Sequence, residues 1–293
     1  MIIVITGPTA VGKTKMSIEL AKKLNGEIIN ADSMQIYQGL DIGTAKVTSA
    51  EKENIPHYLL DIKNPQELYT VYDYQKDARQ VIKDIQNRQK TPILVGGTGL
   101  YIKAALYDYQ FSTEEKQFDY TALNNQELLD KIKKYKIDIN FDIQNRRRLI
   151  RVLTKLENNT YNNNENAHIL YPDVYFIGLT TNRELLYSKI NERVDEMFTA
   201  GLMSEVKKFY DQGINSKALK TGIGYKELYD YFSGKITLEE CKELIKQRSR
   251  KYAKRQYTFF NHQLPIKWFN VNYNNFNETI NEVLKYIEKT NNI

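Results

Sequence analysis

The chain has 293 residues, of which 41% are hydrophobic and 27% are charged, and its formal net charge is +6. No segment approaches the roughly 20 consecutive apolar residues that span a bilayer, and the apolar run Ile2–Ile5 is too short for a signal peptide. Cys241 is the only cysteine, which excludes an internal disulfide, and no cysteine and histidine cluster has the spacing of a metal site. We therefore expect a cytoplasmic protein without a membrane segment, and the positive charge favours a polyanionic partner.

The first expected strand is the β-branched run Ile2–Thr6, which leads directly into the sequence GPTAVGKT. A strand, a glycine-rich loop ending in Gly-Lys-Thr and a helix are the context of a P-loop, whose backbone amides bind phosphate oxygens. The loop residues that this motif assigns to a diphosphate are Gly7, Thr9, Ala10, Val11, Gly12, Lys13 and Thr14. Lys13 supplies a positive charge, and Thr14 can ligate Mg²⁺. P-loops usually bind ATP or GTP, so the motif predicts a diphosphate site but does not identify the donor.

Asp32 follows the next expected strand, Glu27–Asn30, which comes after an amphipathic helix over Lys13–Leu24. A carboxylate at a strand end beside a P-loop is a candidate general base or a Mg²⁺ ligand. The alternative is a helix N-cap, because aspartate after a strand often begins a helix. The position beside the P-loop favours the catalytic interpretation.

A third strand is expected at Ile93–Val95, after a helix over Asp73–Asn87, and it ends in the turn Gly96–Gly99. Thr98 in this turn is a candidate anion ligand, and the alternative is that it only caps the following helix. NTPases place an acid at the end of such a strand to position Mg²⁺. This turn contains no acid, which weakens a motor or GTPase interpretation and leaves a small-molecule kinase open.

Strands that alternate with helices, continuing with Val174–Leu179, predict an α/β fold with a P-loop NTPase-like parallel sheet flanked by helices. Residues 111–145 are polar and helical in pattern, and we interpret them as a small helical insertion. Residues 1–110 and 146–293 would then form the core, with a helical C-terminal part. Residues 158–166 contain six asparagines and indicate a loop, and Thr237–Glu240 fits a capping box.

Two segments of the regions expected to be helical are rich in lysine and arginine. One carries Arg146, Arg147, Arg148 and Arg151, and the other, residues 242–255, holds seven lysines and arginines against one acid. Basic side chains interleaved with Tyr252 and Tyr257 are suited to a phosphate backbone with stacked bases. A single basic run is more often a solvated helix face, but two separated runs favour nucleic acid.

Together these segments resemble the bacterial tRNA dimethylallyltransferase family, also called tRNA isopentenyltransferases. The matching pieces are GPTAVGKT at 7–14, ADSMQIYQGLDIGTAK at 31–46, IPHYLLDI at 55–62, GGTGLY at 96–101, RRLIRVL at 147–153, INERVDEMFTAGLMSEV at 190–206, GIGYKEL at 222–228 and SRKYAKRQYTFF at 249–260. They follow the family's order from one end of the chain to the other.

The resemblance implies a monomeric enzyme that transfers a dimethylallyl group from dimethylallyl diphosphate to N6 of the adenine next to the tRNA anticodon (position 37), with Mg²⁺. It implies that the P-loop binds a diphosphate that leaves as product, that Asp32 is the general base and that Thr98 is a second catalytic contact. The positions that match tRNA-contacting segments are Asp32, Ser33, Met34 and Gln35, then Arg147, Arg148, Leu149, Ile150 and Arg151, and then Arg250, Lys254, Arg255 and Gln256.

The chain departs from the family pattern at Asn261 and at Thr221, where relatives carry arginine. Three alternatives stay open beside the resemblance: a small-molecule kinase, an isopentenyltransferase that acts on free AMP, and a non-catalytic RNA-binding protein. The first two would not need the two basic segments, and the third would not need Lys13 or Asp32.

Overall fold

The structure, a computed structural model, describes residues 1–111, 118–139, 141–161 and 168–291. The chain divides into two compact units. The larger one comprises Met1–Tyr107 and Ile169–Ile293, and the smaller one comprises Asp108–His168. Among the described residues, no helix combines the length and the apolar character needed to cross a bilayer.

A six-stranded parallel sheet with the order β3-β2-β4-β1-β5-β6 forms the centre of the larger unit. Its strands are β1 (Ile2–Thr6), β2 (Gly26–Asn30), β3 (His57–Tyr58), β4 (Thr91–Val95), β5 (Val174–Thr180) and β6 (Lys267–Asn270). The four strands expected from buried β-branched runs are all present, and the expected α/β class is confirmed. The short strands β3 and β6 were not anticipated, and β6 interrupts the otherwise helical C-terminal part.

Both faces of the sheet are covered by helices. Ile2 and Val4 of β1 pack into one apolar cluster, whereas Ile3 and Ile5 pack into another, because successive side chains of a strand point to opposite faces. The first cluster includes the buried sides of α2 (Val71–Asn87) and α3 (Gly99–Leu106). The second includes α1 (Lys13–Lys23) and α11 (Phe276–Asn291). The sheet is therefore buried on both faces, as its apolar strands predict.

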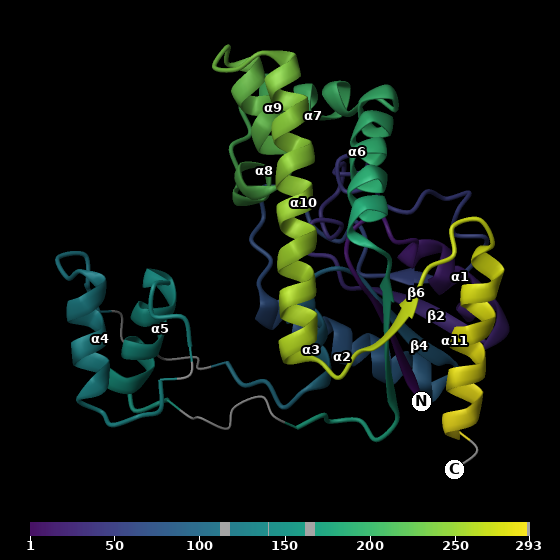
Figure 1. Ribbon diagram of the computed structural model, residues 1–293, viewed down its shortest axis with the longest axis horizontal. Helices are drawn as coiled ribbons and strands as arrows, with labels where there is room; N and C mark the ends of the chain where they lie inside the picture. The colour runs from purple at the N-terminus through teal and green to yellow at the C-terminus, as the bar shows by residue number, and fades with distance from the viewer. Residues whose placement is uncertain (112–117, 140, 162–167, 292–293) are drawn as a thin grey trace. The chain divides into compact units, whose positions relative to one another are not determined.

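A second group of helices extends beyond the carboxyl ends of the strands (Figure 1). It comprises α6 (Arg183–Thr199), α7 (Leu202–Asp211), α8 (Lys217–Thr221), α9 (Tyr225–Phe232) and the long helix α10 (Leu238–Gln263). Thr237 and Glu240 form the capping box that begins α10, as the sequence predicts. Figure 1 shows α10 running from α9 back to the sheet, so one helix reaches both the helical group and the strand ends.

The smaller unit contains α4 (Asn125–Lys133) and α5 (Arg146–Glu157). Its core joins Leu128 and Ile132 of α4 to Leu149, Leu153 and Leu156 of α5. The unit is therefore longer than the expected insertion at 111–145, because the arginine-bearing helix packs onto the insertion instead of the sheet. Residues 162–166 of the asparagine-rich segment and residues 112–117 of the insertion lie outside the described residues.

Candidate active site

The P-loop joins β1 to α1 in a conformation that only glycine readily adopts at two positions. Gly7 has φ 136°, and a Cβ there would lie 2.4 Å from the carbonyl oxygen of Leu179. Gly12 has φ 84°, and a Cβ there would lie 2.7 Å from the ring of Phe276. Gly12 is also the N-cap of α1, and no side chain among the described residues caps that helix. The amides at the positive end of the helix dipole are thus available for an anion.

Lys13 folds over the P-loop from the first turn of α1. Its Nζ donates hydrogen bonds to the carbonyl oxygens of Gly7 (3.0 Å) and Pro8 (2.7 Å). Burial first and the positive charge of Arg193 second lower the pKa of Lys13 to about 7, against the opposing effect of the negative charge of Asp32. An incoming anion would therefore raise the pKa of this amine and hold its proton.

Asp32 lies in a turn at the carboxyl end of β2, and no helix begins there. Its Oδ1 accepts a hydrogen bond from the amide of Met34 (2.9 Å), and its own amide donates to Oδ1 of Asn30 (3.0 Å). The alternative role as a helix N-cap is therefore wrong, because Asp32 closes a short turn that fixes the carboxylate at the strand end.

Thr98 occupies the N-cap position of α3 but forms no side-chain hydrogen bond with that helix. Its Oγ1 instead accepts a hydrogen bond from the amide of Ser33 (3.0 Å) and lies 3.3 Å from Ser33 Oγ. The turn after β4 is thus hydrogen-bonded to the turn that contains Asp32. The Thr98 side chain therefore does not cap α3.

Gln256 connects α10 to the P-loop and to the turn that follows β4. Its Oε1 accepts a hydrogen bond from the amide of Thr9 (3.1 Å), and its Nε2 donates to the carbonyl oxygen of Gly97 (3.1 Å). A Cβ at Gly97 would lie 2.1 Å from that nitrogen, so the glycine makes room for the bridge. Gln256 is buried, and it lies inside the site and not on the exposed face of α10.

Arg193 of α6 is a site residue that the sequence reasoning missed. Its Nη2 donates to the carbonyl oxygen of Thr44 (3.4 Å), and burial lowers its pKa, whereas Asp32 and Glu196 raise it. A signal was present in the sequence, because Arg193 shares one helical face with the apolar residues Ile190, Val194 and Met197. A lone arginine on an apolar face indicates a partner inside the fold.

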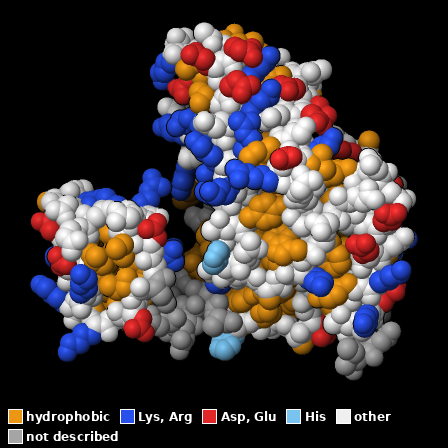
Figure 2. All heavy atoms as spheres, viewed as in Figure 1, with side chains coloured by type: hydrophobic (Ala, Val, Ile, Leu, Met, Phe, Trp, Pro, Cys, Tyr) orange, Lys and Arg blue, Asp and Glu red, His pale blue; other side chains and the backbone are white. Residues whose placement is uncertain are grey.

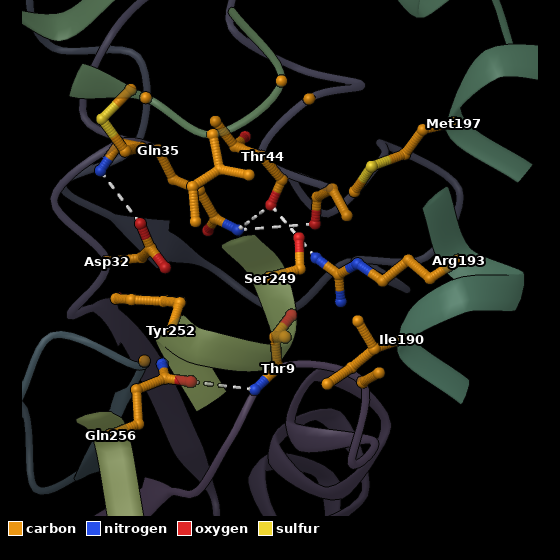
Figure 3. Close-up of a pocket in the computed structure, with 18 of the residues that line it drawn as sticks. Thr9, Asp32, Gln35, Thr44, Ile190, Arg193, Met197, Ser249, Tyr252 and Gln256 are labelled. Atoms are coloured by element: carbon orange, nitrogen blue, oxygen red, sulfur yellow. Dashed lines mark hydrogen bonds between the residues drawn. The ribbon is translucent and has the colours of Figure 1, made fainter. Parts of the chain in front are cut away.

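Gly12, Lys13, Asp32, Arg193 and Gln256 line one cavity of about 390 Å³ within the larger unit, whereas Gly7, Val11 and Thr98 do not line it. Figure 3 shows Asp32, Tyr252 and Gln256 on one side of it and Ile190, Arg193 and Met197 on the other. The larger aliphatic side chains of its wall are Met34, Val95, Ile190, Val194, Met197, Ile223 and Ile245. Among the described residues that line the cavity, Asp32 is the only carboxylate, and the cations Lys13, Arg193 and Arg255 line the same cavity.

A divalent cation in this cavity would need coordinating atoms from a bound diphosphate as well as from the protein. Within the described part of the chain, no group of three or more acidic, histidine or cysteine side chains could hold a metal ion. Thr14 and Asp32 nevertheless both line the cavity. One hydroxyl and one carboxylate beside a diphosphate site fit Mg²⁺, which keeps several waters and takes few protein ligands.

The basic segment of α10 divides into two parts. Lys246 pairs with Asp195 (2.8 Å), Arg248 pairs with Glu227, and Arg250 donates to Oδ1 of Asn191 (2.6 Å). Lys251, Lys254 and Arg255 are exposed, and no described acidic residue forms an ion pair with them. Figure 2 shows lysine and arginine side chains gathered over the middle of α10. Arg250, which was expected to contact tRNA, is half-buried and bonded to α6, and its contact with tRNA stays a prediction.

The predicted tRNA segment of α5 belongs to the smaller unit, separate from the cavity residues. Arg147, Arg148 and Arg151 are exposed, Ile150 is half-buried, and Leu149 is fully buried in the core of that unit. Arg146 donates to the carbonyl oxygens of Leu123 (2.6 Å) and Tyr120 (2.9 Å). Arg146 therefore stabilises the smaller unit, whereas Arg147, Arg148 and Arg151 remain candidate contacts for tRNA.

The two residues that depart from the family pattern both form local contacts. Asn261 accepts a hydrogen bond from Nε1 of Trp268 (3.0 Å), so it connects α10 to β6. Thr221 lines the cavity, and its hydroxyl donates to the carbonyl oxygen of Lys217 (2.8 Å). Neither residue replaces the positive charge, and Arg193 is the cation that α6 brings to the cavity.

Comparison with known proteins gives a consistent picture. A family model described as "IPP transferase" matches residues 35–263. A protein of Anoxybacillus flavithermus named tRNA dimethylallyltransferase is 49% identical, over 98% of this chain and 96% of that protein. A Geobacillus kaustophilus protein of the same name is 46% identical, over 97% and 95%.

Solved structures agree with these matches. The crystal structure of a tRNA delta(2)-isopentenylpyrophosphate transferase from Staphylococcus epidermidis has a TM-score of 0.76 at 40% identity, and 99% of each chain is covered. The structure of a eukaryotic dimethylallyltransferase acting on tRNA has a TM-score of 0.74 at 29% identity, and 91% of this chain and 73% of that one are covered.

Proposed function

This chain belongs to the IPP transferase family, and we propose that it transfers a dimethylallyl group from dimethylallyl diphosphate to N6 of the adenine next to the tRNA anticodon (position 37). The observation that carries this proposal is the single cavity lined by the P-loop residues Lys13 and Thr14 and by the carboxylate of Asp32. A diphosphate donor and a nucleophile that must lose a proton can therefore meet in one place.

Asp32 acts as the general base in this proposal. The lone pair of the adenine N6 amine is delocalised into the ring, so the amine attacks C1 of the donor only if its proton is removed. The N6–C1 bond forms, the C1–O bond to diphosphate breaks, and the proton passes from N6 to the Asp32 carboxylate. General base catalysis of this kind contributes roughly 10²- to 10⁴-fold. Thr98 supports the base indirectly, because it binds the amide of Ser33 beside Asp32.

The P-loop stabilises the leaving group. Negative charge gathers on the diphosphate as the C1–O bond breaks, and the uncapped amides of α1 together with Lys13 face that charge. Lys13 leaves its hydrogen bonds to Gly7 and Pro8 for the phosphate oxygens, and Arg193 adds a second cation from the opposite wall. The loop thus binds a product and transfers no phosphoryl group, which explains why β4 needs no acid at its end.

Mg²⁺ fits the same place, with Thr14 as its protein ligand and Asp32 within the same cavity. The ion supplies charge neutralisation for the departing diphosphate. Thr14 also belongs to the first turn of α1, so its hydroxyl and the P-loop amides converge on one phosphate group.

The apolar part of the cavity wall is suited to the dimethylallyl group, because its five carbons present no polar atom to water. Ile190, Val194 and Met197 of α6 form one side of it. The target adenine must leave the anticodon loop to reach Asp32, and bases of single-stranded loops are readily unstacked. Lys251, Lys254 and Arg255 of α10 and the exposed arginines of α5 are suited to the flanking phosphates. We further propose that the enzyme is a monomer of the cytoplasm.

The test is a transfer assay with purified protein, labelled dimethylallyl diphosphate, Mg²⁺ and unmodified tRNA, followed by nuclease digestion to locate the label. We expect label on the adenine beside the anticodon. Parallel reactions replace tRNA with AMP, or replace the donor with γ-labelled ATP and a pool of metabolites. Transfer to AMP alone would favour the free-nucleotide isopentenyltransferase, phosphate transfer would favour a kinase, and tRNA binding without any transfer would favour a non-catalytic protein.

A further inference from the structure

Glu205 of α7 is a buried carboxylate that the proposed chemistry does not use. It is 9% exposed. Its Oε2 accepts hydrogen bonds from the amides of Asp41 (3.0 Å) and Ile42 (2.7 Å), and its Oε1 accepts from the amide of Gly43 (3.0 Å) and the hydroxyl of Tyr225 (2.6 Å). Three consecutive backbone amides therefore converge on one side chain from another part of the chain.

The negative charge of Glu205 is balanced by these dipoles, since no lysine or arginine of the described residues forms an ion pair with it. Four donors occupy most of the acceptor positions of a carboxylate. Hydrogen bonds to a charged acceptor are the strong ones, and a buried amide without a partner is costly. The segment 41–43 is consequently fixed to α7.

That segment continues directly into the cavity wall, where Gly43, Thr44 and Ala45 lie. The carbonyl oxygen of Thr44 accepts hydrogen bonds from Nε2 of Gln35 (3.1 Å) and from Nη2 of Arg193 (3.4 Å). Figure 3 shows both donors directed at this part of the loop. The backbone that Glu205 holds is therefore next in the chain to the carbonyl oxygen that accepts from Gln35 and Arg193, two residues that line the cavity.

Tyr225 completes the arrangement from α9. Burial and the neighbouring Glu205 charge raise the pKa of its phenol, so the hydroxyl stays protonated and remains a donor. A Cβ on Gly43 would lie 2.7 Å from the Tyr225 ring, so the close packing of loop and ring requires glycine at this position. Tyr225 itself lines the cavity.

We propose that Glu205 is a positioning residue, which together with Tyr225 and Gly43 connects the helical group α7–α9 to the loop 41–45 and thereby orients Gln35 and Arg193 for transfer. This inference rests on the proposed function, because it concerns the same cavity. It predicts that loss of the Glu205 carboxylate impairs the reaction more than it impairs folding.

The test compares Glu205→Gln with Glu27→Gln, a matched change at another buried carboxylate. Glu27 is 1% exposed and binds Arg88, Lys90 and Tyr58 at the amino end of β2. For Glu205→Gln we expect kcat to fall roughly 10- to 100-fold, because small misplacements of positioned groups are costly. We expect the KM for tRNA to change less than about threefold, because the exposed cations of α10 are untouched. For Glu27→Gln we expect a lower Tm with kcat within about twofold of wild type.

Amide hydrogen exchange gives a readout that does not depend on transfer. We expect faster exchange at Ile42 and Gly43 in Glu205→Gln but not in Glu27→Gln, and the same direction with a smaller effect in Tyr225→Phe, which keeps the ring. Unchanged kcat or unchanged exchange in Glu205→Gln would overturn the inference, as would an equal loss of kcat in Glu27→Gln. Absence of transfer by the wild-type protein would count against the proposed function instead, and the exchange comparison would still decide whether Glu205 holds the loop.

Discussion

Among individual residues, Asp32 is the one on which the proposed chemistry depends most directly. It is the only carboxylate among the described residues lining the cavity, and its turn holds it at the end of β2. In Asp32→Asn the amide keeps the shape of the side chain but cannot accept the N6 proton. We expect kcat to fall roughly 10²- to 10⁴-fold while the Kd for tRNA stays nearly unchanged, as measured by single-turnover transfer and by filter binding.

The control for Asp32→Asn is Asp84→Asn, a change at an exposed carboxylate of α2. We expect this control to retain wild-type turnover. Undiminished turnover in Asp32→Asn would remove the base assignment, and loss of tRNA binding without loss of turnover at saturation would reassign Asp32 to substrate binding.

Lys13 gives the site a pH dependence of its own. Its pKa is lowered to about 7 in the free protein, chiefly by burial, and a bound diphosphate would raise it. Binding therefore takes up a proton above pH 7, so the affinity for inorganic diphosphate should fall up to roughly tenfold per pH unit as the pH rises beyond 7. Calorimetric titration in buffers with different ionisation enthalpies would measure both the Kd and the proton uptake.

Lys13→Arg separates the titration of the protein from that of the ligand. Arginine keeps its proton throughout this range, so the variant should show only the pH dependence of diphosphate itself. Identical slopes and identical proton uptake in the two proteins would show that Lys13 is not the titrating group.

Among the helices, α10 contributes to both the interior and the surface of the site. Its earlier cations Lys246 and Arg248 pair with acids of α6 and α9, whereas Lys251 and Lys254 are exposed. In the double variant Lys251→Glu and Lys254→Glu we expect weaker tRNA binding. We also expect the slope of log K against log salt to become smaller by about 1 to 2, because each phosphate contact releases close to one counterion.

The matched control reverses two exposed lysines of α2, Lys76 and Lys83, and so changes the net charge equally. Binding isotherms over a range of salt concentrations would compare the two variants. The same slope change in both would indicate a general charge effect, and an unaltered slope in the α10 variant would remove that helix from the tRNA interface.

The elements that the sequence predicted are those whose signal is local. The strands β1, β2, β4 and β5 are apolar runs bounded by glycine or polar residues, and the P-loop and the α10 capping box are short motifs. The two-residue strand β3 and the strand β6 were missed because they are short and depend on a neighbouring strand for their pairing.

Contacts between distant segments could not be predicted in the same way. The sequence marks Gln256 as part of a basic helix, but only the fold turns it inward to Thr9 and Gly97. Likewise, α5 was assigned to the core although its leucines pack against α4. In both cases the spacing identifies the helix and its apolar face, whereas the partner of that face is set by tertiary packing.

In the whole molecule, an ionic cluster lies at the end of β2 that is opposite to the site. Glu27, buried at 1% exposure, accepts two hydrogen bonds from Arg88 (2.6 Å each) and one from Lys90 (2.7 Å). These bonds, those of Arg88 first, lower the pKa of Glu27 to about 2. A carboxyl with a lowered folded-state pKa stabilises the fold above its unfolded pKa, and the contribution is lost as the pH falls towards the folded value.

Glu27→Gln should therefore lower the free energy of unfolding by on the order of 2 to 3 kcal/mol near neutral pH. The difference from wild type should shrink between about pH 4.5 and pH 2. Urea unfolding at a series of pH values would measure it, with the exposed Glu282→Gln as the control. A difference that does not vary with pH would mean that packing, and not the ionised carboxylate, accounts for the loss.

The Gln256 bridge also bears on how the protein is made. Thr9 and Gln256 are 247 residues apart, so the P-loop is synthesised long before its partner leaves the ribosome. At about 5–20 residues per second, the interval is roughly 12 to 50 s. During that time the loop has β1 and α1 but lacks α10, and the amide of Thr9 is without its acceptor on Gln256. A nascent chain that ends before α10 therefore has the first motif of the sequence without the helix that closes it, and α11, whose Phe276 packs on Gly12, is translated later still.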